Sequence, residues 1–196
     1  MNYISDFLFW ITTGMLVPVI VLLILCFIRA LLLAGGFFGR YMNQRRNAAA
    51  INEALLALTP QDTLDRFHDI VKKSSSPAVP YYIQVLNAQT QAKRDLVISS
   101  YEIEAGRELS SSQTLIKMGP VLGLMGTLIP MGPALVGLST GDIASMAYNM
   151  QVAFATTVVG LFAGAVGTLI TQVLRRWQAR DIANLEYLSS LISQKP

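Results

Sequence analysis

Residues 118–141 read MGPVLGLMGTLIPMGPALVGLSTG and residues 143–174 read IASMAYNMQVAFATTVVGLFAGAVGTLITQVL, so two long uncharged stretches flank Asp142. About 20 predominantly apolar residues are enough to cross the hydrocarbon core of a bilayer. Each stretch can therefore cross once. The sequence from Leu115 to Leu174 predicts a transmembrane hairpin, with its turn at Ser139-Thr140-Gly141-Asp142.

Small residues recur at helical spacing along one face of each predicted span. The stripe in the first span comprises Gly119, Gly123, Gly126, Pro130, Ala134 and Gly137, and the stripe in the second comprises Ala153, Thr157, Gly160, Gly164, Thr168 and Thr171. Gly119/Gly123 and Gly160/Gly164 are GxxxG pairs, which let helix backbones approach closely in lipid. We therefore expect helix-packing roles for Gly119, Gly123, Gly126, Gly160 and Gly164, although glycine is common in any membrane helix.

The composition is that of a membrane protein. Hydrophobic residues make up 53% of the chain, charged residues 14%, and the mean hydropathy is +0.47. The basic residues are not gathered into a stripe with aromatics, so nucleic-acid binding is not expected. The single cysteine, Cys26, cannot form an intrachain disulfide, and the single histidine, His68, has no cysteine partners for a zinc site.

A further span is predicted near the N-terminus. The stretch from Phe7 to Ile28 is uncharged and long enough to cross a bilayer. No basic residue precedes it, which favours a retained span over a signal peptide. Pro18 is expected to bend this helix or loosen a turn. We assign residues 1–40 to the first transmembrane helix.

Residues 41–114 are polar and predict a cytoplasmic helical region. Helices are expected from Asn47 to Leu58 and from Thr59-Pro60 to about Lys73, where Ser74 to Pro77 ends the second. From Pro80 onward we expect one long helix that enters the membrane as the second span. The weak periodicity leaves a loose linker as the alternative.

The chain leaves the third span at Arg175-Arg176-Trp177, residues that favour a cytoplasmic membrane interface. The transmembrane hairpin is thus assigned to residues 115–175. Apolar residues then recur at helical spacing in residues 176–196, namely Ile182, Leu185, Leu188 and Ile192. This pattern predicts an amphipathic cytoplasmic helix that extends the third span.

The orientation follows from the 15 lysines and arginines. None precedes Phe7 or lies in the turn of the hairpin, and all except Arg29 lie between Arg40 and Lys117 or after Leu174. The positive-inside rule then places the N-terminus outside and the long loop and the C-terminus inside. The predicted fold class is an all-α integral membrane protein with three transmembrane helices and long cytoplasmic helical extensions. The expected location is the inner (cytoplasmic) membrane.

No catalytic, cofactor-binding or metal-binding motif is present, and no Asp or Glu lies inside a span. A carrier of protons within a membrane is usually a buried carboxyl group, so this chain does not supply one. It does place the hydroxyls of Thr127, Thr156 and Thr157 at membrane depth. Each hydroxyl either faces a proton pathway or bonds a carbonyl one turn back in its own helix.

Two motifs in the hairpin resemble a known family. The stretch from Gly119 to Thr127, GPVLGLMGT, resembles the start of the second membrane helix of the MotA/TolQ/ExbB proton channel family, and that from Ala155 to Ala163, ATTVVGLFA, resembles its third. Thr127 and Thr157 match the pore threonines of the family. Val152 stands where ExbB-like members carry a glutamate, so the subfamily stays open.

This resemblance implies a proton-conducting subunit of an ion-driven rotary motor. Five such chains would surround the single membrane helices of two partner subunits, each with an aspartate near the start of its helix. The expected partners are thus a homopentamer, an ExbD/TolR/MotB-like protein and protons, with no cofactor. The alternative from the residues alone is a non-conducting scaffold that oligomerises through the glycine stripes.

Overall fold

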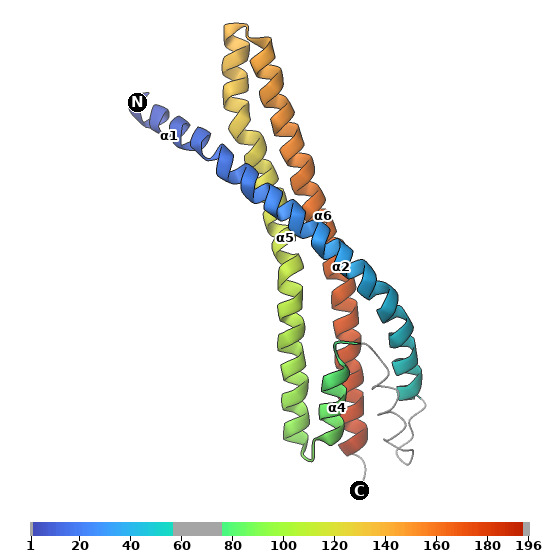
Figure 1. Ribbon diagram of the computed structural model, residues 1–196. Coiled ribbons are helices and arrows are strands. Elements are labelled where there is room, and N and C mark those ends of the chain that lie inside the picture. The colour runs from blue at the N-terminus through green and yellow to red at the C-terminus, as the bar shows by residue number, and fades with distance from the viewer. Residues whose placement is uncertain (1, 57–75, 194–196) are drawn as a thin grey trace. The chain divides into compact units, whose positions relative to one another are not determined.

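The computed structural model describes residues 2–56 and 76–193, except for the side chains of residues 2, 5, 6 and 43–56. The helix start predicted at Thr59-Pro60 and the histidine His68 lie outside these described residues. The elements are α1 (Asn2–Gly14), α2 (Leu16–Leu56), α4 (Val79–Asn87), α5 (Gln91–Thr140) and α6 (Ile143–Ser193) (Figure 1). Every one of them is a helix.

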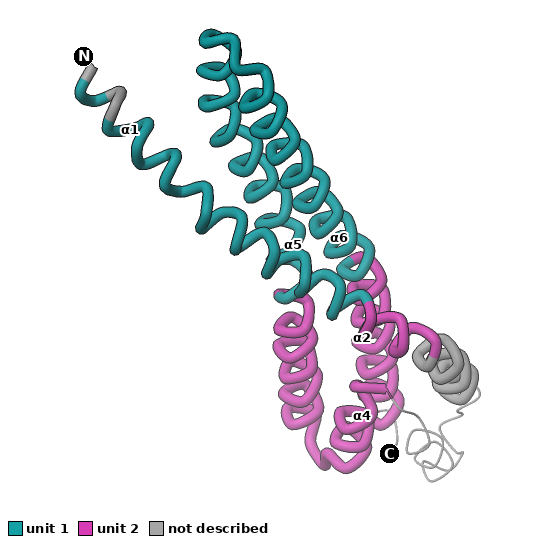
Figure 2. The backbone as a smooth tube through the Cα atoms, turned by 45° about the horizontal axis from the view of Figure 1, so that its top comes forward, with its two compact units in different colours: residues 1–34, 111–171 teal, residues 35–110, 172–196 magenta. Residues whose placement is uncertain are grey.

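Three helical segments are long and apolar enough to cross a membrane: Phe7–Met42, Gln91–Thr140 and Ile143–Ser193. This finding confirms the predicted all-α membrane class with three spans. The chain divides into two compact units (Figure 2). Unit 1 comprises residues 1–34 and 111–171, and unit 2 comprises residues 35–110 and 172–196.

The first span is interrupted close to its proline. Helix α1 ends at Gly14 and α2 begins at Leu16, with Met15 in a turn between them. Pro18 has no backbone N–H to donate to the carbonyl of Gly14, one turn earlier. The loosened turn that the sequence predicted at Pro18 therefore lies on its N-terminal side.

In unit 1, α5 and α6 run side by side and meet at a tight turn (Figure 1). Gly141 adopts a φ of 78°, a left-handed conformation that glycine adopts readily. The Asp142 carboxylate then accepts a hydrogen bond of 3.0 Å from the backbone N–H of Ser145 at the start of α6. The turn lies at the residues where the sequence predicted it.

The first span packs against this hairpin. Val19 and Leu23 of α2 share a buried cluster with Leu122 and Ile129 of α5. About two turns after Leu23 on α2, Ala30 packs with Leu115 of α5 and Ala163 of α6. Unit 1 is thus a bundle of three spans with apolar contacts along its interior.

The prediction of one long helix from Pro80 onward is wrong in unit 2. A separate helix, α4, comes first, and residues 88–90 are not helical and separate it from α5. The Thr90 hydroxyl accepts a hydrogen bond of 3.4 Å from the N–H of Lys93, and the Arg94 side chain donates one of 3.1 Å to the Ala88 carbonyl. These bonds satisfy backbone groups that the break leaves open.

The break lets α4 fold back onto α5 and α6. Tyr82 and Val85 of α4 are completely buried, and they share one core with Tyr101 of α5 and with Leu185 and Leu188 of α6. Helix α6 reaches Ser193 without interruption. The amphipathic tail predicted after the third span is therefore helical, and its apolar face forms part of this core.

Candidate functional site

The backbones of α5 and α6 approach closely at three glycines. A Cβ atom added to Gly119 would lie 2.6 Å from the carbonyl oxygen of Gly160, and one added to Gly160 would lie 2.8 Å from the Cα of Gly123. These separations are far below normal carbon contact distances. Gly119, Gly123 and Gly160 thus form a seam at which no larger residue fits without displacement.

The seam continues along the hairpin in the direction away from its turn. A Cβ atom on Gly164 would lie 3.0 Å from the ring carbons Cγ and Cδ of Pro120. Gly167 belongs to the same seam, since its Cβ would lie 2.8 Å from the carbonyl oxygen of Ser112. Gly167 was not predicted from the sequence, although its spacing from Gly160 and Gly164 continues the same helical face.

These contacts change one expectation. The scaffold alternative joined copies of the chain through the glycine stripes, but in the structure Gly123 and Gly164 lie inside the hairpin of a single chain. The two helices are joined by a short turn, so they meet each other at a high effective concentration. Any contact between copies of the chain has to use other faces.

Thr156 lies in the helix contact. Its side chain is buried, and a Cβ atom on Gly126 would lie 2.6 Å from the Thr156 hydroxyl. The hydroxyl donates to the carbonyls of Val152 and Ala153 at 3.1 and 2.9 Å. Gly126 therefore leaves the space that the Thr156 side chain fills.

Thr127 and Thr157 line a common groove on the side of the hairpin. The groove has a volume of about 560 Å³, and its other lining residues are Pro120, Leu124, Phe154, Val158 and Leu161. Thr127 comes from α5 and Thr157 from α6, and both are half-buried. The structure thus brings together the two threonines that the family resemblance singled out and keeps Thr156 out of the groove lining.

Both groove hydroxyls bond carbonyls of their own helices. The Thr127 hydroxyl donates to the Leu124 carbonyl at 2.7 Å, and the Thr157 hydroxyl donates to the Ala153 carbonyl at 3.2 Å. A hydroxyl oxygen that donates its proton still has two lone pairs for accepting hydrogen bonds. The groove can therefore accept a hydrogen bond from a protonated acid, and a rotated hydroxyl can donate to a carboxylate.

The rim of the groove is strongly apolar and open. The exposed fractions of Leu124, Phe154 and Val158 are 59%, 66% and 67% in the single chain. In a membrane this surface faces lipid or another apolar helix. A polar group brought to the groove would find the two threonine hydroxyls as its side-chain hydrogen-bonding partners.

The fold and the groove define an integral membrane protein with three spans, in which the hydroxyls of Thr127 and Thr157 form a small polar site on the side of the hairpin. A model of the MotA/TolQ/ExbB proton channel family matches residues 75–187, more than half of the chain, and the chain belongs to this family. Members of this class are membrane channels for protons rather than enzymes. No curated protein matches the chain.

Proposed function

We propose that this chain is the proton-conducting ring subunit of an ion-driven rotary motor. In this proposal five copies surround two single-span partner helices, and the groove of Thr127 and Thr157 receives an aspartate that each partner helix carries. The N-terminus and the hairpin turn lie outside, and the helical extensions lie in the cytoplasm. Family membership and the one-sided distribution of basic residues support this arrangement.

The observation that carries the proposal is the shared groove. Two threonines from different helices line it, and all its other lining residues are apolar. An aspartate at the centre of a membrane costs about 2.5–3.5 kcal/mol on insertion scales. Hydrogen bonds to the two hydroxyls offset part of this cost, so the groove suits a carboxyl group that arrives on a helix.

The chain's own composition fits a partner that supplies the acid. Residues 7–28, 118–141 and 143–174 contain no Asp or Glu, so a titrating group at membrane depth has to come from elsewhere. Each proton that crosses the membrane then delivers about 2.3 kcal/mol per 100 mV of potential. The open apolar rim around Leu124, Phe154 and Val158 gives the partner helices and neighbouring copies a surface to pack against.

The test is reconstitution with a partner. The chain is purified together with a single-span protein that is encoded next to it and carries an aspartate near the start of its helix. Subunits are counted by native mass spectrometry, and the complex is placed in liposomes under a membrane potential. We expect proton flux from the complex, none from the chain alone, and none after the partner aspartate is changed to asparagine.

Two outcomes would contradict the proposal. A complex that assembles with the partner but carries no protons would favour the scaffold. Flux that persists without the partner or its aspartate would mean that the acid is not supplied as proposed.

A further inference from the structure

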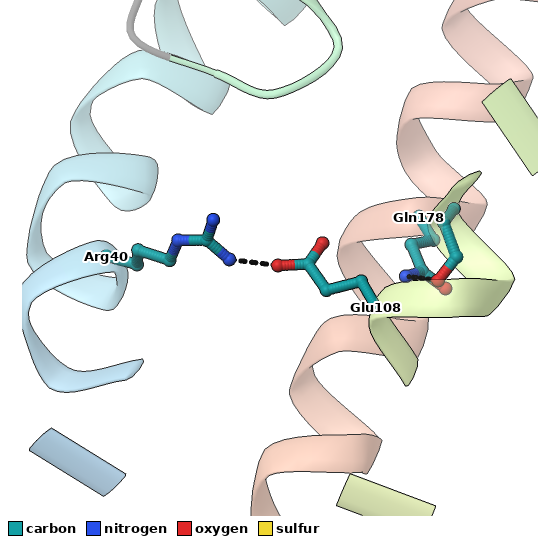
Figure 3. A network of polar contacts seen from close by, with 4 residues as sticks. Arg40, Glu108 and Gln178 are labelled. Atoms are coloured by element: carbon teal, nitrogen blue, oxygen red, sulfur yellow. Dashed lines mark hydrogen bonds and ion pairs between the residues drawn. The ribbon is translucent and has the colours of Figure 1, made fainter. Parts of the chain in front are cut away.

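Unit 2 contains a cavity that the proposed channel does not use. Its volume is about 1090 Å³, and its walls come from α2, α4, α5, α6 and the residues just before α4. Arg40 and Glu108 point toward each other across part of it (Figure 3). Gln178, also in the wall, donates a hydrogen bond of 2.7 Å to the carbonyl oxygen of Ala105 (Figure 3).

One carboxyl group in the wall of this cavity is buried. Asp181 of α6 is only 9% exposed, and its Oδ2 accepts a hydrogen bond of 3.0 Å from the Tyr101 hydroxyl of α5. The phenol of Tyr82, from α4, is also close enough to Asp181 for each to affect the ionisation of the other. Side chains from three helices therefore meet at a single acid.

The other charged groups around the cavity pair with one another. Arg40 forms an ion pair with Glu108, and Arg107 lies 3.6 Å from Glu104. Asp181 belongs to neither pair, and the neighbouring Arg180 on α6 is the cation whose charge acts on it. The described side chain that hydrogen-bonds Asp181 is therefore a phenol, that of Tyr101, rather than a cation in a direct ion pair.

This setting favours the neutral acid. Burial raises the pKa of Asp181 from 3.8 to about 6, although the hydrogen bond from Tyr101, the charge of Arg180 and the nearby phenol of Tyr82 act in the opposite direction. Burial and the nearby carboxylate also raise the pKa of both phenols, so Tyr82 and Tyr101 stay protonated. The acid can thus change its charge near pH 6 while the phenols beside it do not.

We propose that Asp181 is a proton-binding site of this chain, which exchanges protons with the water of the cavity in unit 2. On uptake, the carboxylate takes a proton from hydronium, and the products are the neutral acid and water. On release, the acid returns the proton to water, and the carboxylate again accepts the hydrogen bond from Tyr101. Its placement on the cytoplasmic side of a proton channel rests on the proposed function, but the titration itself does not.

The experiment is an infrared titration of the full chain in lipid nanodiscs without any partner. The carbonyl stretch of a protonated carboxyl group is followed from pH 4 to pH 8. In wild type we expect one band that is lost with a midpoint near pH 6. It should be missing from Asp181→Asn and present in Asp95→Asn, which changes an exposed carboxyl group on α5.

A third variant separates proton binding from mere packing. Tyr101→Phe removes the phenol that lowers the pKa of Asp181. The band should therefore persist to a pH above the wild-type midpoint. This shift also tests the assignment if Asp181→Asn does not fold, as judged by circular dichroism.

The proposal is overturned if no band titrates between pH 5 and pH 7, if Asp181→Asn retains the band, or if Tyr101→Phe leaves the midpoint unchanged. None of these results depends on proton flux. A failed titration would leave the threonine groove untouched, and a failed reconstitution would leave Asp181 as a proton site.

Discussion

The carbonyl oxygen of Gly119 lies 2.5 Å from the point that a Cβ atom on Gly160 would occupy. Helices α5 and α6 therefore meet backbone to backbone at this point. In lipid, where apolar side chains gain little by leaving the solvent, such close approach is a main source of helix association. The hairpin should depend on these two glycines more than on the large apolar residues at its surface.

Gly160→Ala tests this dependence. The added methyl group would collide with backbone atoms of Gly119 and Gly123, which cannot rotate away. We expect the free energy of unfolding in mixed micelles to fall by about 1–3 kcal/mol, as for other overpacked sites. Gly106→Ala is the control, because a Cβ there would have no atom within 4 Å. An equal response of both variants would contradict the seam.

Cysteine labelling tests the proposed orientation. In a Cys26→Ala background, Ser139→Cys near the hairpin turn should react with an impermeant reagent added from outside. Ser100→Cys, on the part of α5 in unit 2, should react only after the membrane is permeabilised. Both serines are exposed in the structure, so access through the protein does not limit either reaction. Reversed labelling would overturn the orientation inferred from the basic residues.

The stability of the chain should depend on pH through Asp181. The unfolded chain releases this proton near pH 3.8 and the folded chain near pH 6, so the folded state binds more protons in between. The free energy of unfolding should therefore fall as the pH rises through this window. The difference between the two pKa values corresponds to about 3 kcal/mol.

Asp181→Asn should lack this loss. We compare the free energies of unfolding of the variant and wild type by chemical denaturation. Between pH 4 and pH 7.5 their difference should shift in favour of the variant by up to about 3 kcal/mol. Asp95→Asn should follow the wild-type curve. Parallel curves for Asp181→Asn and wild type would show that the carboxyl group is not buried as described.

Much of the fold could be predicted because membrane spans leave strong signals. The uncharged stretches on both sides of Asp142 and the glycine beside it fixed the hairpin and its turn. The separate helix α4 could not be predicted. It depends on the burial of Tyr82 and Val85 against α5 and α6, which are distant in sequence.

The candidate site could be predicted only in part, because the side chains that line it depend on how two helices pack. Thr156 and Thr157 are neighbours about 100° apart on one helix, and the sequence cannot tell which of them faces Gly126. Asp181 did leave a signal that was overlooked. It lies four and seven residues before Leu185 and Leu188, on the same helical face, where a buried carboxyl group is unusual.

The pore role of the groove hydroxyls is tested by the double change Thr127→Val/Thr157→Val. Valine keeps the approximate shape of threonine but cannot hydrogen-bond an aspartate. Thr156→Val and Thr168→Val are matched controls, since these hydroxyls bond their own helix carbonyls and do not line the groove. All variants should assemble with the partner, which is established by native mass spectrometry before transport is measured.

The deciding measurement is partner-dependent proton flux in liposomes that hold equal numbers of assembled complexes. A buried hydrogen bond to a charged group contributes about 1.5–3 kcal/mol. Flux in the double variant should therefore fall at least about tenfold, while both controls stay close to wild type. Equal flux in the double variant and wild type would contradict the pore role and leave Thr127 and Thr157 as packing residues of the hairpin.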